Sequence, residues 1–572
     1  MALPRLEVRG LTVRFGGNTV VDDVSFTVDA AECVGLVGAS GSGKSVTSLA
    51  LMGLLPQENT TVEGSAILHL EQGSVDLLRL TGKRIQRYRG NEIAMVFQEP
   101  MTALDPVYPV GEQVAEAVRK HLGLDHKAAR RRVISLFEEV QLPEPEQLYR
   151  RYPHQLSGGQ KQRVVIAMAI SCGPKVLLCD EPTTALDVLV QREVLDILRA
   201  LRAKHAMGMV FITHDLGVVA EVAERVLVMH RGKVVEQGDV QQVFSAPEHP
   251  YTKGLLACRP VKDPKGDPRR LPTVEDLLAG RAPASTRELI AHEAKRAHVE
   301  ALLRQPPLLR IEKVEKVFTR THGPLGKVER TPVLHDITFA VHPGESLGIV
   351  GGSGSGKTTL GRSILQLIQP TSGHVFYKER DLTTLSPKEM RSLRRELQII
   401  FQDPYSSLNP RMAVGRAIAE AMEVHGIGAG QEERRERTVA LLRRVGLEAA
   451  HFDRFPHQFS GGQRQRIVIA RALALEPTVI ICDESIAALD VSVQAQVLNL
   501  LNDLQDEHGL TYLFISHDLN AVRYFCDRIL VLERGGIAEI GGAEEVTAHP
   551  ASPYTRRLVN AIPGGNSDLG RR

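Results

Sequence analysis

The sequence predicts an α/β protein made of two tandem copies of one unit, each built on a parallel sheet. Two observations lead to this fold class. A glycine-rich loop follows an apolar, strand-like run twice, at residues 38–45 and 351–358. An apolar run that ends in Asp-Glu also occurs twice, at 176–181 and 479–484. Such continuous apolar runs are typical of parallel strands that helices cover on both faces, with a ligand crevice at their carboxyl ends.

Composition excludes several classes of protein. The chain has 572 residues, with 70 Lys and Arg against 68 Asp and Glu, so its near-balanced charge argues against nucleic acid as a main partner. The first residues lack the apolar stretch of a signal peptide. The most apolar region, 164–179, is broken by Gly-Pro-Lys at 173–175, so no membrane-spanning segment is expected. The six cysteines form no C-x-x-C pair, which favours a reducing compartment.

The spacing of the motifs defines the repeat. Lys44 and Lys357 are 357 − 44 = 313 residues apart, whereas Ser157 and Ser460 are 460 − 157 = 303 apart. The extra residues fall mainly between the glycine loop and a glutamine in the first half, so the halves are in register from the serines onward. The predicted boundaries are a first domain with a C-terminal tail at 1–259, a linker at 260–307, and a second domain with its own tail at 308–572.

Alternating apolar and polar residues open the first half. The runs at 6–9, 11–15 and 24–28 predict antiparallel strands that lead into the strand before the glycine loop. Phe15 and its counterpart Phe318 are candidates for stacking on adenine. A place in the core of the sheet explains these aromatic residues equally well, because a half-buried strand favours such side chains.

The glycine-rich loops predict two phosphate cradles. Glycines let the loop fold so closely that its backbone N–H groups point inward at a triphosphate, and the following helix adds the positive end of its dipole. The lysine then reaches the β- and γ-phosphates, and the next hydroxyl reaches Mg²⁺. The predicted cradle residues are Gly38, Ser40, Gly41, Gly43, Lys44 and Ser45, and in the second copy Gly351, Ser353, Gly354, Gly356, Lys357 and Thr358.

A Ser-Gly-Gly-Gln motif opens a predicted helix in each half, after a helix-periodic stretch that spans 111–140 in the first half. The motifs are Ser157-Gly158-Gly159-Gln160 and Ser460-Gly461-Gly462-Gln463, followed by the helical runs 161–170 and 464–473. A hydroxyl, free N–H groups and the helix dipole make a second anion site at such a position. An ordinary helix N-cap fits the spacing equally well.

The two Asp-Glu pairs predict a metal ligand and a base at the end of a buried strand. Asp180 or Asp483 can hold Mg²⁺ through water. Glu181 or Glu484 can orient and deprotonate an attacking water molecule. One acidic turn after a strand is a moderate signal, but two at equal offset from the same neighbours are a strong one.

The segment between the copies, 260–307, is rich in proline and charge, and residues 285–304 predict one exposed helix. Because its positive and negative charges are interspersed, the sequence favours a solvated tether over a binding segment.

Together these motifs resemble the ATP-binding-cassette ATPases, over nearly the whole chain outside the linker. The resemblance implies two tandem P-loop domains, each with a parallel-sheet core, an antiparallel β subdomain and a helical subdomain. It also implies that Gln98 and Gln402 sense Mg²⁺ and a transmembrane partner, and that His214 and His517 contact the γ-phosphate. Asp187 and Asp490 would bridge the two halves.

The tail after each core resembles that of the oligopeptide, dipeptide and nickel importers. It reads His249-Pro250-Tyr251-Thr252 in the first half, and more loosely His549-Pro550 with Pro553-Tyr554-Thr555 in the second. Some relatives hold an iron-sulfur centre after this tail, but Cys258 alone offers too few thiolates, so no cluster is expected. The second half has Ser485-Ile486 where the first has Pro182-Thr183, which leaves open whether its Asp-Glu turn has the same geometry.

The leading hypothesis is the ATP-hydrolysing subunit of a bacterial importer with two head-to-tail ATP sites. Two transmembrane permease subunits and an extracytoplasmic binding protein would be its partners, with no nucleic acid, at the cytoplasmic face of the inner membrane. The alternative is a soluble tandem ATPase that acts on ribosomes or DNA. A nucleotide-gated regulator without turnover is disfavoured because Glu181 and Glu484 are both present. The resemblance implies a peptide-like or nickel-type cargo, but no residue of the chain identifies the transported compound.

Overall fold

The computed structural model describes residues 4–184, 186–260, 266–280, 289–321, 328–486 and 489–563. The chain forms two compact units. The first contains Met1–Ala257, Val274–Arg281 and Ile562–Arg572, and the second contains Cys258–Thr273 and Ala282–Ala561. Each unit holds a four-stranded sheet and a six-stranded sheet, and the linker contributes one further strand pair, β11 (Asp267–Pro268) with β12 (Leu289–Ile290).

The six-stranded sheet of the first unit is parallel except at one edge. Its strands, in order, are β10 (Lys233–Asp239), β9 (Arg225–His230), β3 (Cys33–Val37), β8 (Gly208–Ile212), β7 (Val176–Asp180) and β6 (Ile93–Val96). Only the β9–β10 pair is antiparallel. Every residue of β3, β7 and β8 is buried, as the continuous apolar runs require.

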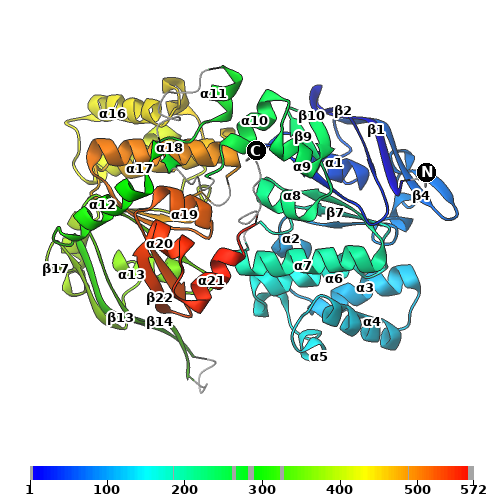
Figure 1. Cartoon of the computed structure of the whole chain (residues 1–572), viewed down its shortest axis with the longest axis horizontal. Coiled ribbons are helices and arrows are strands. Elements are labelled where there is room, and N and C mark those ends of the chain that lie inside the picture. The colour runs from blue at the N-terminus through cyan, green and yellow to red at the C-terminus, as the bar shows by residue number, and fades with distance from the viewer. Residues whose placement is uncertain are drawn as a thin grey trace. The chain divides into compact units, whose positions relative to one another are not determined.

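The other sheet of the first unit is antiparallel, with the order β2 (Asn18–Val28), β1 (Leu6–Phe15), β4 (Thr60–Leu70) and β5 (Gly73–Asp76). The main helices are α1 (Lys44–Leu51), α3 (Val110–Leu122), α4 (His126–Glu139), α6 (Gly158–Ile170), α7 (Val188–His205), α8 (Leu216–Val222), α9 (Val240–Ser245) and α10 (Pro250–Ala257). Figure 1 shows α3 and α4 together, apart from β1, β2 and β4. The predicted parallel core, antiparallel subdomain and helical subdomain are therefore all present.

The second unit repeats this architecture. Its antiparallel sheet has the order β14 (Val328–Val341), β13 (Leu309–Thr321), β16 (Ser372–Tyr377), β17 (Arg380–Asp381). Its core sheet has the order β18 (Leu397–Ile400), β19 (Val479–Asp483), β20 (Thr511–Ile515), β15 (Ser346–Gly351), β21 (Arg528–Glu533), β22 (Gly536–Gly542). Its helices are α13 (Lys357–Ile364), α14 (Pro387–Leu393), α15 (Val414–Val424), α16 (Gln431–Arg444), α17 (Gly461–Leu473), α18 (Val491–His508), α19 (Leu519–Phe525), α20 (Ala543–Ala548) and α21 (Pro553–Asn560).

No helix among the described residues is long and apolar enough to cross a membrane. Five of the six cysteines are buried and all six are free thiols. Burial raises the pKa of the Cys33 thiol to about 12, so it behaves as a small apolar side chain.

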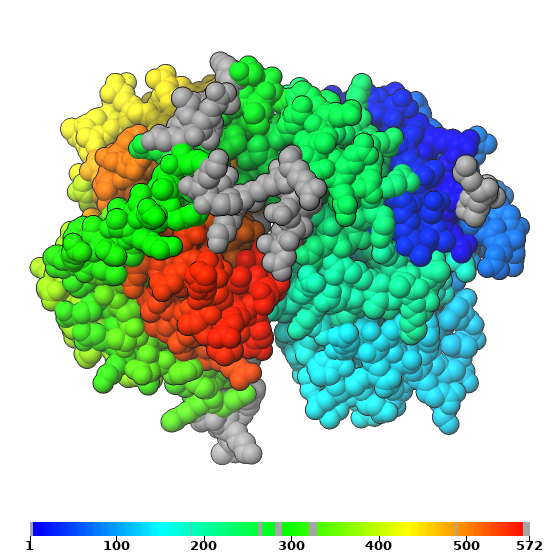
Figure 2. Space-filling view, viewed as in Figure 1, coloured from blue at the N-terminus to red at the C-terminus, as the bar shows by residue number. Residues whose placement is uncertain are grey.

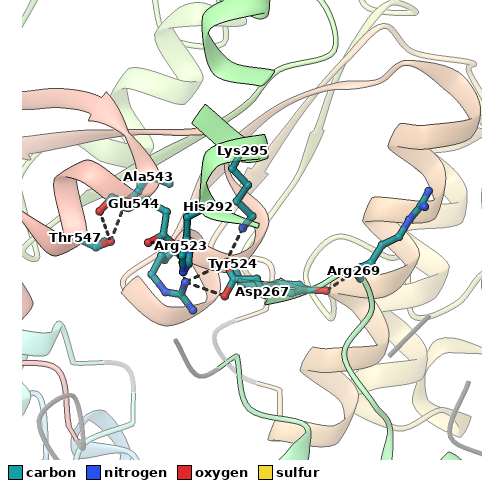
Figure 3. Close-up of polar contacts among 9 residues, drawn as sticks. All are labelled: Asp267, Arg269, His292, Lys295, Arg523, Tyr524, Ala543, Glu544 and Thr547. Atoms are coloured by element: carbon teal, nitrogen blue, oxygen red, sulfur yellow. Dashed lines mark hydrogen bonds and ion pairs between the residues drawn. The ribbon is translucent and has the colours of Figure 1, made fainter. Parts of the chain in front are cut away.

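The described linker residues 266–273 and 289–307 belong to the second unit, whereas α11 (Val274–Leu278) belongs to the first, which differs from the solvated tether that the sequence favoured. Asp267, only 1% exposed, pairs through both carboxylate oxygens with Arg523 Nη1 of α19, at 2.9 and 3.0 Å (Figure 3). Arg523 is 4% exposed and also pairs with Glu544 at 2.7 Å. Nearby, Leu271 and the Asn499 side chain exchange two backbone–amide hydrogen bonds of 2.9 and 2.8 Å.

The linker helix α12 spans His292–Leu303, so it begins later than the sequence predicted. Residues 285–288 of the predicted helix lie outside the described residues. Lys295 of α12 pairs with Asp267 at 2.7 Å, and His292 lies 3.5 Å from Glu544. Figure 2 shows α12, in green, lying against the red C-terminal part of the second unit. The helix is largely exposed, as the sequence predicted, with Leu302 as its buried residue. The sequence did not predict that Lys295 and His292 have partners in the fold.

Candidate functional site

The cradle of the first unit connects β3 to α1 at the carboxyl end of the parallel strands. Gly38 has φ 153°, and a Cβ atom there would lie 2.2 Å from the carbonyl oxygen of Met229. Gly43, the N-cap of α1, has φ 103°. Any larger residue at Gly38 would therefore push the loop away from β9. Gly351 and Gly356 repeat both features in the second unit, with φ 154° and 103°.

The cradle lysines are buried and bound to the loop itself. Lys44 Nζ donates to the carbonyl oxygens of Gly38 at 2.8 Å and Ala39 at 3.0 Å. Lys357 makes the same two bonds to Gly351 and Gly352, at the same distances. The ammonium group is thus held at the cradle. Phosphate oxygens of a bound triphosphate would replace the carbonyl oxygens as its hydrogen-bond acceptors.

The predicted metal ligands come together in both units. Ser45 Oγ donates to Asp180 Oδ1 at 2.9 Å, and Thr358 Oγ1 donates to Asp483 Oδ1 at 2.9 Å. Burial and the neighbouring Glu181 raise the pKa of Asp180 to about 6, although Ser45 and Lys44 oppose the shift. A hydroxyl and a carboxylate that is costly to leave charged form an oxygen donor set that suits Mg²⁺.

The turns that carry the two glutamates have the same backbone geometry. Glu181 and Glu484 have φ 47° and 48°, a left-handed conformation that is unusual for a residue with a side chain. Each donates its backbone N–H at 2.9 Å to the last residue of the next strand, Ile212 or Ile515. The change to Ser485-Ile486 therefore leaves the Asp-Glu turn unaltered.

Three side chains surround the Glu181 carboxylate. Gln98 Nε2 donates to Oε2 at 3.0 Å, Thr184 Oγ1 donates at 2.8 Å, and His214 Nδ1 lies 3.3 Å away. Burial would raise the pKa of Glu181, but the His214 contact, with Thr184 and Lys44, lowers it to about 2. The carboxylate is thus charged and oriented from three directions.

Glu484 has a looser set of contacts. Gln402 Nε2 donates to it at 2.8 Å, and His517 Nδ1 lies 3.8 Å away. The His517 contact lowers the pKa of Glu484, against the effect of burial. Thr184 corresponds to Ala487 in the second half, which has no hydroxyl group. Sequence reasoning missed this difference, although an alignment of the two halves displays it.

The Ser-Gly-Gly-Gln motifs cap helices α6 and α17. Ser157 Oγ accepts the Gln160 N–H at 3.3 Å, and the Gln160 side chain accepts the Ser157 N–H at 3.1 Å. Ser460 and Gln463 form the same capping box in α17. The N-cap interpretation is therefore correct, but it does not exclude an anion at the exposed helix end.

The two glycines of each motif have different surroundings. A Cβ atom on Gly159 would lie 2.5 Å from Val190 of α7, so packing requires this glycine. At Gly158 a Cβ atom would meet nothing within 4 Å. Gly462 and Gly461 repeat this contrast. Because packing does not require Gly158 or Gly461, a bare backbone there suits the close approach of a ligand.

The remaining predicted residues lie at helix starts or on strands of the antiparallel sheets. Asp187 caps α7 through the N–H groups of Leu189 and Val190, both at 3.1 Å, and Asp490 caps α18. Phe15 packs partly against the core, whereas Phe318 is 43% exposed with the Lys316 ammonium 5.1 Å from its ring.

Two family models match this chain. The model for "ABC transporter" matches residues 21–184 and 334–487. The model for "Oligopeptide/dipeptide transporter, C-terminal region" matches residues 235–282 and 538–570, which contain the two tails.

Two relatives are similar to this chain over nearly its whole length. The chain is 46% identical to the glutathione import ATP-binding protein GsiA of Pectobacterium atrosepticum over 566 residues, which cover 98% of this chain and 89% of the relative. It is 45% identical to GsiA of Escherichia coli K12, over 95% of this chain and 86% of the relative. Among solved structures, it is similar to a dimeric ATP-binding cassette bound to ADP and Pi, with 31% identity over 41% of this chain and 98% of that chain and a TM-score of 0.38.

Proposed function

We propose that this chain, which belongs to the ABC transporter family and is an ABC-type ATPase, drives the import of glutathione or a related short peptide. The peptide would pass through separate membrane subunits. The observation that carries the proposal is the 46% identity to a glutathione import ATP-binding protein over 98% of this chain. The match of both tails to the oligopeptide/dipeptide region supports the same cargo class. It also speaks against the alternative of a soluble ATPase acting on ribosomes or DNA.

Each ATP site would work through residues of one crevice. Lys44 and the cradle N–H groups would hold the phosphates, while Ser45 and Asp180 would hold Mg²⁺, which neutralises charge on the phosphate oxygens. Glu181 would accept a proton from the attacking water, because its carboxylate is charged and its neighbours fix its direction. His214, which lies 3.3 Å from this carboxylate, would contact the γ-phosphate.

The second site would use the equivalent residues, with Glu484 as base and with His517 and Gln402 beside it. We infer that each Ser-Gly-Gly helix end covers the nucleotide of the opposite domain, with Asp187 and Asp490 bridging the halves. A cradle binds one side of a triphosphate, and a second element must exclude water from the other side before hydrolysis.

A cleft beside Gln402 supports docking of a permease segment. The cleft has a volume of about 570 Å³ and includes Phe401, Gln402, Ser406 and Arg471 in its lining. Tyr405 next to it is 51% exposed. A short segment of a membrane subunit would fill such a cleft, and Gln402 would connect that segment to Glu484.

A reconstitution experiment tests the proposed cargo. The chain is co-expressed with the permease and binding-protein genes of its own organism, purified as a complex, and placed in nanodiscs. Its ATPase rate should rise severalfold when the binding protein is loaded with glutathione. The Glu181→Gln/Glu484→Gln variant serves as the matched control, because it should assemble with the permeases but show no stimulated turnover.

Other outcomes would redirect the proposal. Stimulation by a dipeptide or tripeptide series but not by glutathione would keep the importer and replace its cargo. Purification with ribosomes or DNA in place of two polytopic membrane proteins would support the alternative function.

A further inference from the structure

The tail of each unit reaches back to the phosphate cradle through one tyrosine. The backbone N–H of Ala39 donates to Tyr251 Oη at 2.9 Å, although the two residues are 212 positions apart. In the second unit the N–H of Gly352 donates to Tyr554 Oη at 2.8 Å, across 202 positions. Both tyrosines are buried, at 2% and 8% exposed. The same bond thus occurs twice, although the cradles and the tails repeat at different offsets.

This bond orients the peptide unit on which the cradle lysine rests. The Ala39 N–H and the Gly38 carbonyl belong to one planar peptide group. Tyr251 binds its N–H, and Lys44 Nζ binds its carbonyl oxygen at 2.8 Å. A rotation of this peptide plane would break both bonds together. The Gly351–Gly352 peptide has the same two partners, Tyr554 and Lys357.

The first tail is built to hold its tyrosine in place. Glu236 of β10 accepts the backbone N–H groups of Glu248 at 2.7 Å and His249 at 3.1 Å. His249 Nδ1 in turn accepts the N–H of Tyr251 at 3.1 Å. The ring of His230 stacks on the Tyr251 ring, with centroids 4.0 Å apart and an interplanar angle of 10°.

The second tail reaches the same arrangement with different residues. Glu539 of β22 accepts the N–H groups of Ala551 and Ser552, both at 2.9 Å. Ser552 Oγ replaces the histidine and accepts the Tyr554 N–H at 3.2 Å. In place of a stacked histidine, the Arg557 guanidinium lies 5.5 Å from the centre of the Tyr554 ring. The tyrosine hydroxyl is the shared feature, whereas its supports differ.

We propose that Tyr251 and Tyr554 are positioning residues for ATP: their hydroxyl groups fix the first peptide of each cradle and thereby the seat of the cradle lysine before nucleotide binds. This function assigns a role in the nucleotide site to the tails. It does not depend on the identity of the cargo. A loop held in one conformation strengthens the binding of ATP equally in the ground state and in the transition state. Loss of the tyrosine hydroxyl should therefore weaken ATP affinity and leave kcat unchanged.

The test uses the full-length chain with one site silenced. In a Lys357→Ala background, binding of a fluorescent ATP analogue with Mg²⁺ reports the first site, and Tyr251→Phe removes only the hydroxyl. The dissociation constant should rise about threefold to tenfold, the effect of one lost hydrogen bond. Tyr554→Phe in a Lys44→Ala background should show the same rise at the second site. With both lysines present, Tyr251→Phe should raise KM for ATP and leave kcat unchanged.

Tyr149→Phe is the matched control, because it removes a buried hydroxyl that bonds Glu112 at 2.8 Å in the helical subdomain. It should lower the unfolding temperature as much as Tyr251→Phe while leaving ATP affinity unchanged. An unchanged dissociation constant in Tyr251→Phe, an equal loss of affinity in Tyr149→Phe, or a fall in kcat without a change in KM would each overturn the proposal. If Tyr251→Phe does not fold, Glu236→Gln tests the same support, and unaltered ATP affinity in that variant would count against it.

Discussion

At the scale of single residues, the two halves differ most around the glutamates. Glu181 and Glu484 share a backbone conformation, with φ 47° and 48°. Glu181, however, has the Thr184 hydroxyl at 2.8 Å and His214 at 3.3 Å, whereas His517 lies 3.8 Å from Glu484. Because more side chains fix the direction of Glu181, we expect the first site to be the faster one at equal nucleotide occupancy.

Glu181→Gln should slow ATP hydrolysis by about 10² or more, since a positioned acid or base contributes roughly 10² to 10⁴. ATP binding should persist, because the cradle is untouched. Phosphate release measured at saturating ATP checks this, with Glu484→Gln as the parallel variant. Wild-type turnover in Glu181→Gln would exclude this residue from its proposed role. If Glu484→Gln alone has no effect on turnover, the second site is not the working one.

Thr184→Ala should bring the first site closer to the second, which has Ala487 at the corresponding position. The loss of one hydrogen bond to a charged carboxylate costs about 1.5–3 kcal/mol. We expect part of this cost to raise the activation free energy of hydrolysis. We therefore expect kcat to fall a few-fold with little change in KM. Equal rates in Thr184→Ala and wild type would show that the hydroxyl does not help to orient Glu181.

At the scale of elements, most of the described linker belongs structurally to the second unit, whereas α11 (Val274–Leu278) belongs to the first. Asp267 and Arg523 are both buried, and Asp267 also pairs with Lys295 of α12. Removal of one partner from a buried ion pair leaves an uncompensated charge, which costs more than the pair contributes. The linker should therefore stabilise the second unit, beyond connecting it to the first.

Asp267→Asn should destabilise the second unit by about 3 kcal/mol, because Arg523 keeps only Glu544 as a charged partner among these contacts. Urea unfolding of the full chain measures this in the unfolding transition of the second unit. Asp503→Asn is the control, since its pair with Arg270 is half-exposed and should contribute less than about 1 kcal/mol. Equal effects of the two substitutions would mean that the buried network is not formed in solution.

The effect of Asp267→Asn should also depend on pH. Burial would raise the pKa of Asp267, but Arg523 and Lys295 lower it below its ordinary value of 3.8. A carboxyl group with a depressed pKa in the folded state stabilises the fold above its unfolded pKa, and this contribution is lost as the pH falls through the folded pKa. The difference in unfolding free energy between wild type and Asp267→Asn should thus be constant above about pH 5 and shrink below about pH 4. A difference that grows toward acid would contradict this sign.

At the scale of the whole molecule, the proposed ATP cycle requires each half to complete the nucleotide site of the other. With Glu181 and Glu484 blocked, Lys44→Ala should couple to Ser460→Ala by about 0.5–3 kcal/mol in ATP affinity and be nearly additive with Ser157→Ala. A double-mutant cycle on nucleotide binding measures both values. Coupling within one half would contradict the head-to-tail arrangement.

The whole chain should also be free of an iron-sulfur cluster. Among the described residues, Cys258 belongs to no group of three or more potential metal ligands. Too few thiolates surround it to hold a cluster. Iron and acid-labile sulfide assays on anaerobically purified protein should give no signal, and a stoichiometric signal would refute this prediction.

The sequence by itself determined the two-copy α/β architecture, the cradles and the acidic strand ends. These features are local: an apolar run, a glycine at a fixed position or a carboxylate after a strand follows from residues that are neighbours in the chain. Only the tertiary structure shows that the Asp-Glu turn keeps its backbone conformation before Ser485-Ile486. It alone also shows that Asp267 pairs with Arg523 and that Tyr251 accepts a hydrogen bond from Ala39. The last two contacts join residues 256 and 212 positions apart. Such pairs leave no period or local pattern, because the fold brings together an ion pair or a single hydrogen bond that neither segment specifies alone.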